Sequence, residues 1–170
     1  MYHLGVFVHI VSAIVWVGGA FFLALVVVPV ARRLPPADRA ALVAAVGSRF
    51  RVIGWTCLAL LVASGLVNLH YRGVTWGSIA SGTLLESTFG RLVAAKLALV
   101  VAMMAVSAIH DFVVGPASAR AYAVAGADPS PAVRAEIANL RRRAAWLARV
   151  TALLALAIVA VAVALVRGLP

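Results

Sequence analysis

The chain has 170 residues, of which 65% are hydrophobic, and its mean hydropathy is +1.08. A soluble domain is closer to half apolar, so this composition excludes an ordinary soluble protein and predicts an integral membrane protein. The single cysteine, Cys57, excludes an internal disulfide and a cysteine-rich zinc or iron–sulfur site. The net charge of +10 comes from basic residues that flank apolar runs, so membrane lipid is an expected partner and nucleic acid is not.

Four apolar runs are each long enough to cross a bilayer, which requires about 20 residues in a helix. None of them shows the alternation of a transmembrane β-barrel, so the predicted fold class is all-α. We expect an integral membrane four-helix bundle that forms a single transmembrane domain over residues 1–170. Its predicted spans are residues 4–30, 52–71, 92–114 and 146–166.

Two of the three connections between spans carry helix signals of their own. Pro35 and Pro36 break the helix after the first span, and Asp38 is a plausible cap for a short interfacial helix that leads into the second span. Residues 128–131 predict a turn after the third span, followed by a helix that begins near Ala132 and runs into the fourth.

The arginines predict how the chain is oriented. The first and third connections lie on one side of the membrane and carry eleven arginines, whereas the other side carries only Arg72, Arg91 and Arg167. The positive-inside rule therefore places both termini outside the cytoplasm, in a multi-pass protein of the cytoplasmic (inner) membrane. The eleven are Arg32, Arg33, Arg39, Arg49, Arg51, Arg120, Arg134, Arg141, Arg142, Arg143 and Arg149.

The most informative polar residue is His9, which lies in a first run that has no charged residue between Leu4 and Val30. At helical spacing His9 shares a stripe with Ser12 and Trp16. An imidazole in hydrocarbon is costly, so it normally faces other helices and has a partner there. We interpret His9 as a ligand to something held between helices; the alternative is a histidine hydrogen-bonded to a neighbouring helix.

Counting residues from the cytoplasmic ends of the spans places three ionisable residues in one outer layer. His9 lies about 31 Å, His70 about 28 Å and Lys96 about 26 Å from that side, at 1.5 Å per residue. Two imidazoles from two helices are a known axial pair for haem iron. The hypothesis is a haem b site with His9 and His70 as metal ligands, with Lys96 near the propionates and Trp16 beside the cofactor. His3 is the second choice of ligand.

Other interpretations of the same residues stay open. Copper favours cysteine, methionine and histidine, but Cys57, Met103 and Met104 lie far from the His9 layer or on uncertain faces, and Met1 is terminal. His70 is an ordinary interface residue if it is the face with Ser64 and Asn68 that points inward. His110, next to Asp111, is interpreted as part of a polar helix end rather than as a ligand.

Four places in the chain carry a family resemblance: His9–Gly19, Pro29, Ser64–Leu66 and Lys96–Val100. They resemble the copper resistance D (CopD-like) membrane proteins and the related HemJ-type protoporphyrinogen oxidases. In the HemJ type, a histidine of the first helix and a lysine before a Leu-rich run are associated with haem b; these positions match His9 and Lys96, and a later histidine of that helix resembles His110. The CopD-like resemblance implies copper handling.

The sequence therefore favours a haem b protein for redox, electron transfer or binding of a gas such as nitric oxide or oxygen near the outer face. A HemJ-type protoporphyrinogen oxidase and a copper transport or tolerance protein are the alternatives. Whether the chain is an enzyme stays open, with a haem-dependent oxidoreductase as the enzymatic option. A redox partner and a homo-oligomer are further expectations, the latter because Gly- and Ala-rich spans favour helix association.

Overall fold

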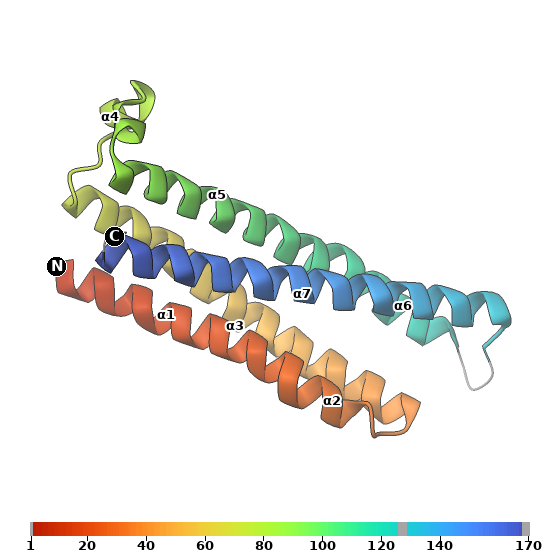
Figure 1. Ribbon diagram of the computed structural model, residues 1–170. Coiled ribbons are helices and arrows are strands. Elements are labelled where there is room, and N and C mark those ends of the chain that lie inside the picture. The colour runs from red at the N-terminus through yellow and green to blue at the C-terminus, as the bar shows by residue number, and fades with distance from the viewer. Residues whose placement is uncertain (1, 126–128, 168–170) are drawn as a thin grey trace. The chain divides into compact units, whose positions relative to one another are not determined.

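The computed structural model describes residues 2–125 and 129–167, and every regular element in those ranges is helical (Figure 1). Two elements, η1 and η3, are π-helical segments that continue the helices around them, and η2 is a short 3₁₀ helix. The elements are α1 (Tyr2–Phe22), η1 (Leu23–Val27), α2 (Val28–Ala31), α3 (Pro36–Tyr71), α4 (Trp76–Ala80), η2 (Thr83–Glu86), α5 (Thr88–Ala108), η3 (Ile109–Val114), α6 (Gly115–Ala125) and α7 (Pro131–Arg167).

Four of the described helices are long and apolar enough to cross a membrane, so the predicted all-α membrane protein with four spans is confirmed. They cover Tyr2–Ala31, Ala37–Tyr71, Thr88–Tyr122 and Pro131–Arg167. Each is longer than the predicted span, because polar residues at the membrane boundary continue the helix instead of ending it. The orientation of the termini and the single transmembrane domain stay predictions.

Prolines inside two of these helices explain the π-helical segments. A helical proline has no N–H to donate, and its ring collides with the carbonyl four residues earlier. In both places the residue just before the proline donates to a carbonyl five residues back: Val28 to Leu23 before Pro29, and Gly115 to His110 before Pro116. The wider π turn makes room for the proline ring, so the chain stays helical through both prolines, and the helix of the third span continues beyond its predicted end at residue 114.

The starts of α3 and α7 refine the predicted caps. Pro35 is the N-cap of α3, without a side-chain cap, and Asp38 lies in the first turn. Asp38 is therefore not the N-cap that the sequence suggested. Its negative charge in the first turn still interacts favourably with the helix dipole. Helix α7 begins at Pro131, one residue before the predicted start at Ala132. Of the predicted turn at 128–131, residue 128 lies outside the described residues.

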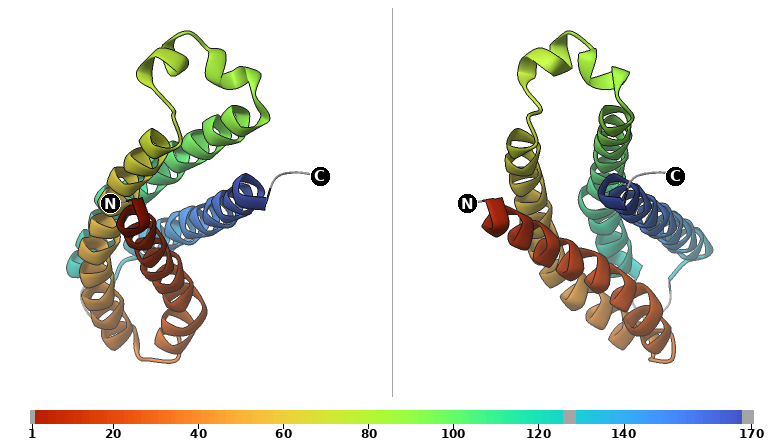
Figure 2. Two further views of the ribbon diagram at one scale, coloured as in Figure 1. Left: turned by 90° about the vertical axis from the view of Figure 1, so that its left-hand side faces the viewer. Right: turned by 60° about the vertical axis from the view of Figure 1, so that its left-hand side comes forward.

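The chain divides into two compact units, of which the first contains residues 2–95 and 163–167. Its main contact is between α1 and α3, which run antiparallel and are joined through α2 and a short turn (Figures 1 and 2). Small residues bring the two helices together: a Cβ on Gly54 would meet Trp16, and a Cβ on Gly19 would collide with Phe50. Close approach at glycines is the usual way in which helices associate in membranes.

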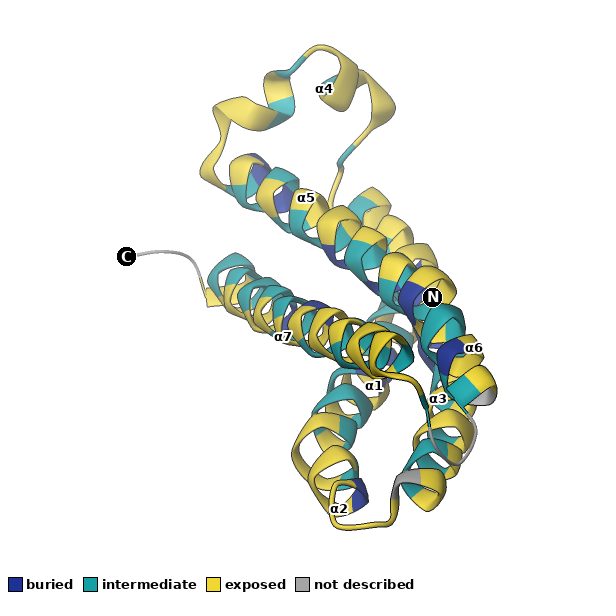
Figure 3. Cartoon of the chain, turned by 90° about the vertical axis from the view of Figure 1, so that its right-hand side faces the viewer, coloured by how far each residue is buried: buried dark blue, intermediate teal, exposed yellow. Residues whose placement is uncertain are grey.

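The second unit contains residues 96–125 and 129–162. In both units, few positions on the helices are buried (Figure 3). Large apolar side chains such as Ile14, Leu25 and Leu153 are 66%, 70% and 67% exposed. Such surfaces are expected of helices that face lipid, because hydrocarbon solvates them as well as a protein interior does.

Candidate functional site

The first polar contact between α1 and α3 involves His9. Its Nδ1 lies 2.9 Å from Oγ of Ser64, and this contact joins residues 55 positions apart in the chain. His9 is half-buried and Ser64 is 6% exposed. The prediction that an imidazole in the first span needs a partner on another helix is therefore met by a hydroxyl group.

The hydrogen bonds of Ser64 assign the tautomer of His9. A serine hydroxyl has one proton, and Ser64 donates it to the carbonyl oxygen of Leu60. Its oxygen must then accept from His9, which places the imidazole proton on Nδ1. In the neutral ring the lone pair is on Nε2, an atom through which histidine binds metals, and metal-binding histidines characteristically donate their other N–H to a fixed acceptor.

A second polar group lies one turn away along α3. Oδ1 of Asn68 is buried and has no hydrogen-bond partner among the described residues. A Cβ added to Gly5 would lie 3.1 Å from this oxygen, so Gly5 leaves the space that the amide occupies. Burying an amide oxygen without a hydrogen-bond partner costs about 1–3 kcal/mol of folding free energy. A polar ligand that donated a hydrogen bond to this oxygen would offset that cost.

We refer to this surface as the α1–α3 seam, defined by Gly5, His9, Ser12 and Trp16 of α1 and Gly54, Ser64, Gly65 and Asn68 of α3. Gly65 is part of it because a Cβ there would come within 3.4 Å of the His9 ring. Trp16, 5% exposed, is buried beside Gly54. The seam therefore combines a positioned imidazole, an unpartnered amide oxygen and small residues.

His70 does not face the seam. It lies two residues beyond Asn68, which on a helix is about 200° further round and so nearly the opposite face. Its ring is exposed and contacts Tyr71 edge-on, and Tyr71 contacts Tyr2, which in turn contacts His3. This aromatic group has the composition of a membrane-interface belt, which favours the interface interpretation of His70.

The antiparallel alignment also corrects the predicted common layer of His9 and His70. His9 is level with Ser64, whereas the ring contact between Tyr2 and Tyr71 puts His70 near the start of α1. His70 thus lies about 9 Å further along the helix pair than His9, at 1.5 Å for each of six residues. The predicted depth of His70 was wrong because residues were counted from Arg51 as the cytoplasmic end of the span, whereas α3 is a continuous helix from Pro36. The proposed pairing of the two histidines on a haem stays a prediction.

The other candidate residues belong to the second unit. Lys96 is half-buried on α5. Met103 is 4% exposed and Ser107 8% exposed, and the Ser107 hydroxyl has no hydrogen-bond partner among the described residues. His110 follows on the same face, in η3, and its Nδ1 lies 2.9 Å from Oδ1 of Asp111. The polar pair is confirmed, but it lies within a continuous helix rather than at a helix end.

No group of three or more histidine, cysteine, aspartate or glutamate side chains suited to a metal ion occurs in the described part of the chain. The single cysteine, Cys57, is buried, seven residues before Ser64 and so on the same face of α3. About 10 Å of helix rise separates these two positions. The face of α3 that carries Ser64 therefore also carries a buried thiol at a second level, and the spacing of Cys57 and Ser64 is the sequence signal that indicates it.

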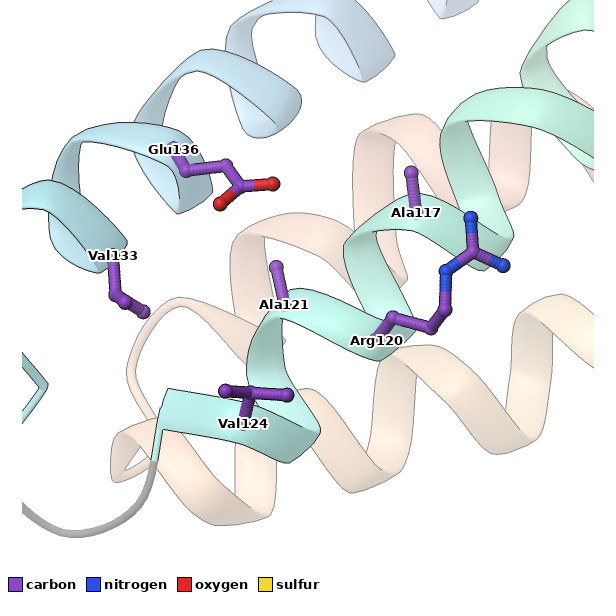
Figure 4. A pocket seen from close by; sticks show the side chains of 6 residues that line it. All are labelled: Ala117, Arg120, Ala121, Val124, Val133 and Glu136. Carbon is purple, nitrogen blue, oxygen red and sulfur yellow. The ribbon is translucent and has the colours of Figure 1, made fainter.

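A hollow of about 240 Å³ lies between α6 and α7 in the second unit. In Figure 4 the Glu136 carboxylate extends from α7 over Ala121 of α6, while Arg120 points elsewhere. The remaining lining residues are small and apolar. This hollow lacks the imidazole, thiol or thioether groups that the other candidates contain.

Comparison with known proteins identifies relatives but no characterised activity. The family model described as "Copper resistance protein D" matches residues 44–165. A protein of Aquifex aeolicus (strain VF5), described as an uncharacterized protein, is 33% identical over 116 residues, which is 68% of this chain and 71% of the relative. No solved structure matches. The matched family region includes the α3 side of the seam and ends near the end of α7, while His9 lies before it.

Proposed function

Because the chain belongs to the copper resistance protein D family, we propose that it carries copper ions across the membrane that it spans. The observation that supports this most strongly is the hydrogen bond between His9 and Ser64, which directs the imidazole lone pair to Nε2 within an apolar span. Imidazole, thiolate and thioether groups are the protein donors that copper prefers.

The face of α3 that carries Ser64 supplies further groups for an ion in transit. Cys57 is buried about two turns away on this face, and one turn on the other side of Ser64 the Asn68 amide oxygen adds an acceptor without a hydrogen-bond partner among the described residues. Donors spaced along a helix pair suit a cargo that must be bound and then released. A closed set of three or four ligands, as in a structural metal site, would hold the ion too tightly to pass it on.

Haem b is the second candidate, because a histidine oriented by a hydrogen bond also suits an axial ligand. In this case His9 would hold the iron and Trp16 would lie beside the porphyrin, while the role of Lys96 near the propionates stays a prediction. His70 can be the second ligand only if the haem packs against α3 without α1, because the His70 side chain is exposed and points away from the α1–α3 seam. Haem would supply redox chemistry or gas binding, and porphyrinogen oxidation is the enzymatic version of this candidate.

The metal and pigment content of the purified protein separates the two candidates. We expect about one Cu(I) bound per chain in buffered Cu(I), released again to a stronger chelator, and no Soret band from protein expressed in haem-sufficient cells. A stoichiometric Soret band with sharp bands on reduction, together with no retained copper, would replace the copper proposal with haem b. Folded protein that retains neither would contradict both candidates.

A further inference from the structure

A groove in the second unit combines arginines with an apolar wall. It has a volume of about 470 Å³ and lies between η3 and the middle of α7. Its lining includes Ile109 and Val113 of η3 and Arg142, Arg143, Trp146 and Leu147 of α7.

The groove is positively charged. Arg142 and Arg143 are exposed, and neither forms an ion pair with a carboxylate of the described residues. Arg141 precedes them directly and adds a third positive charge at the same level of α7. Two guanidinium groups without an acidic partner are suited to bind a phosphate, because their planar donors match its oxygens.

The rest of the lining is suited to hydrocarbon. Ile109 is 48% exposed and Val113 60% exposed, while Leu147, 8% exposed, forms the base. Trp146, 61% exposed, lies one turn beyond Arg142 and Arg143, where the apolar part of α7 begins. Tryptophan prefers the boundary between headgroups and acyl chains, so the groove has a polar end and an apolar end in the order of a bilayer leaflet.

The other hollow of this unit lacks this combination. Glu136 is part of its lining together with Arg120, so its two charges have opposite signs (Figure 4). An anionic ligand would meet a carboxylate there, whereas no carboxylate is among the residues that line the groove. The distribution of charge therefore distinguishes the two hollows, and only the groove favours an anion.

We propose that this groove binds one anionic phospholipid, with its phosphate between Arg142 and Arg143 and an acyl chain along Ile109, Val113 and Trp146. The site is independent of copper or haem binding at the α1–α3 seam. Basic hollows between helices, next to apolar surface, are the form that specific binding of anionic lipids takes in membrane proteins.

The test is a lipid titration of the full-length protein in detergent, followed by native mass spectrometry. Phosphatidylglycerol binds at least about tenfold more tightly than phosphatidylcholine, because phosphatidylcholine has the same phosphate but also a choline cation that the two arginines repel. The Arg142→Gln/Arg143→Gln variant loses this preference. Excess glycerol 3-phosphate does not displace the lipid, because the acyl chain contributes to binding.

The matched control is Arg32→Gln/Arg33→Gln, which removes the same charge from two exposed, consecutive arginines outside the groove. This variant keeps the preference for phosphatidylglycerol to within about twofold. An equal loss in both variants would overturn the site, because it would indicate general attraction by net charge. Displacement of the lipid by glycerol 3-phosphate would overturn it too, because it would indicate an anion site without a lipid groove. Thermal unfolding of each variant identifies any loss due to misfolding, and Trp146→Ala, at an exposed position, independently weakens lipid binding.

Discussion

Replacing His9 with alanine lowers the affinity of the purified protein for Cu(I) by more than about a hundredfold. Losing the group that orients a metal ligand typically costs 10–100-fold, and losing the ligand itself costs more. The measurement is a competition titration against a chromogenic Cu(I) chelator, with retained copper counted per chain. Under the haem alternative, the same variant loses the Soret band instead, so the two readouts separate the candidates. Full retention of copper in His9→Ala, or an unchanged Soret band under the haem alternative, would exclude His9 as a ligand.

A matched pair of hydroxyl variants refines this result. Ser64 and Thr56 both lie on α3 and both donate to the carbonyl four residues earlier, but only Ser64 contacts His9. Ser64→Ala therefore weakens Cu(I) binding by about 10–100-fold, since the imidazole loses the acceptor that fixes its tautomer. Thr56→Ala, at an exposed position, leaves the affinity unchanged. Equal effects of the two substitutions would show that Ser64 acts only through helix stability.

Gly90→Ala destabilises the protein by about 3 kcal/mol, at the upper end of the range for overpacking. Gly90 is buried in the first turn of α5, and a Cβ there would collide with the carbonyl oxygen of Leu84, a backbone atom that cannot move without rebuilding η2. The same turn includes the Ser87 hydroxyl, which accepts from the Gly90 N–H at 3.0 Å. The measurement is the midpoint of thermal unfolding, followed by tryptophan fluorescence in detergent.

Gly18→Ala is the control for this substitution. It adds the same methyl group to a helical glycine, but nothing lies within 4 Å of the new Cβ. Because alanine favours a helix over glycine, this variant is at least as stable as the parent protein. If Gly90→Ala unfolded at the same temperature as Gly18→Ala, the close packing between η2 and α5 would be disproved.

The sequence was sufficient to predict the four spans, because hydropathy and length determine which segments can cross a bilayer. It also identified His9, since a single imidazole in an uncharged run is unusual enough to indicate a partner. Helix ends were harder to predict. The third span was predicted to end at residue 114, yet the helix continues through Pro116, which a π turn with an i−5 hydrogen bond accommodates.

The partner of His9 could not be predicted, because it depends on how α1 and α3 align. The predicted alignment paired His9 with His70, whereas contacts of Gly5 with Asn68 and of Gly19 with Phe50 place Ser64 opposite His9. Those contacts depend on which small residues of α1 and α3 allow the two helices to approach closely along their whole length. The sequence does contain the relevant signal, in that Ser64 and Asn68 share a face from which His70 is excluded.

Copper transport by the protein in sealed vesicles tests the central proposal most directly. The wild-type chain is reconstituted into vesicles that enclose a Cu(I)-selective fluorescent probe, and buffered Cu(I) is added outside. We expect signal in the vesicles to rise at least about tenfold faster than in protein-free vesicles, and the His9→Ala variant to lose this increase because it lacks the positioned imidazole. A wild-type rate equal to that of protein-free vesicles, from folded and fully incorporated protein, would contradict the proposal that the chain carries copper.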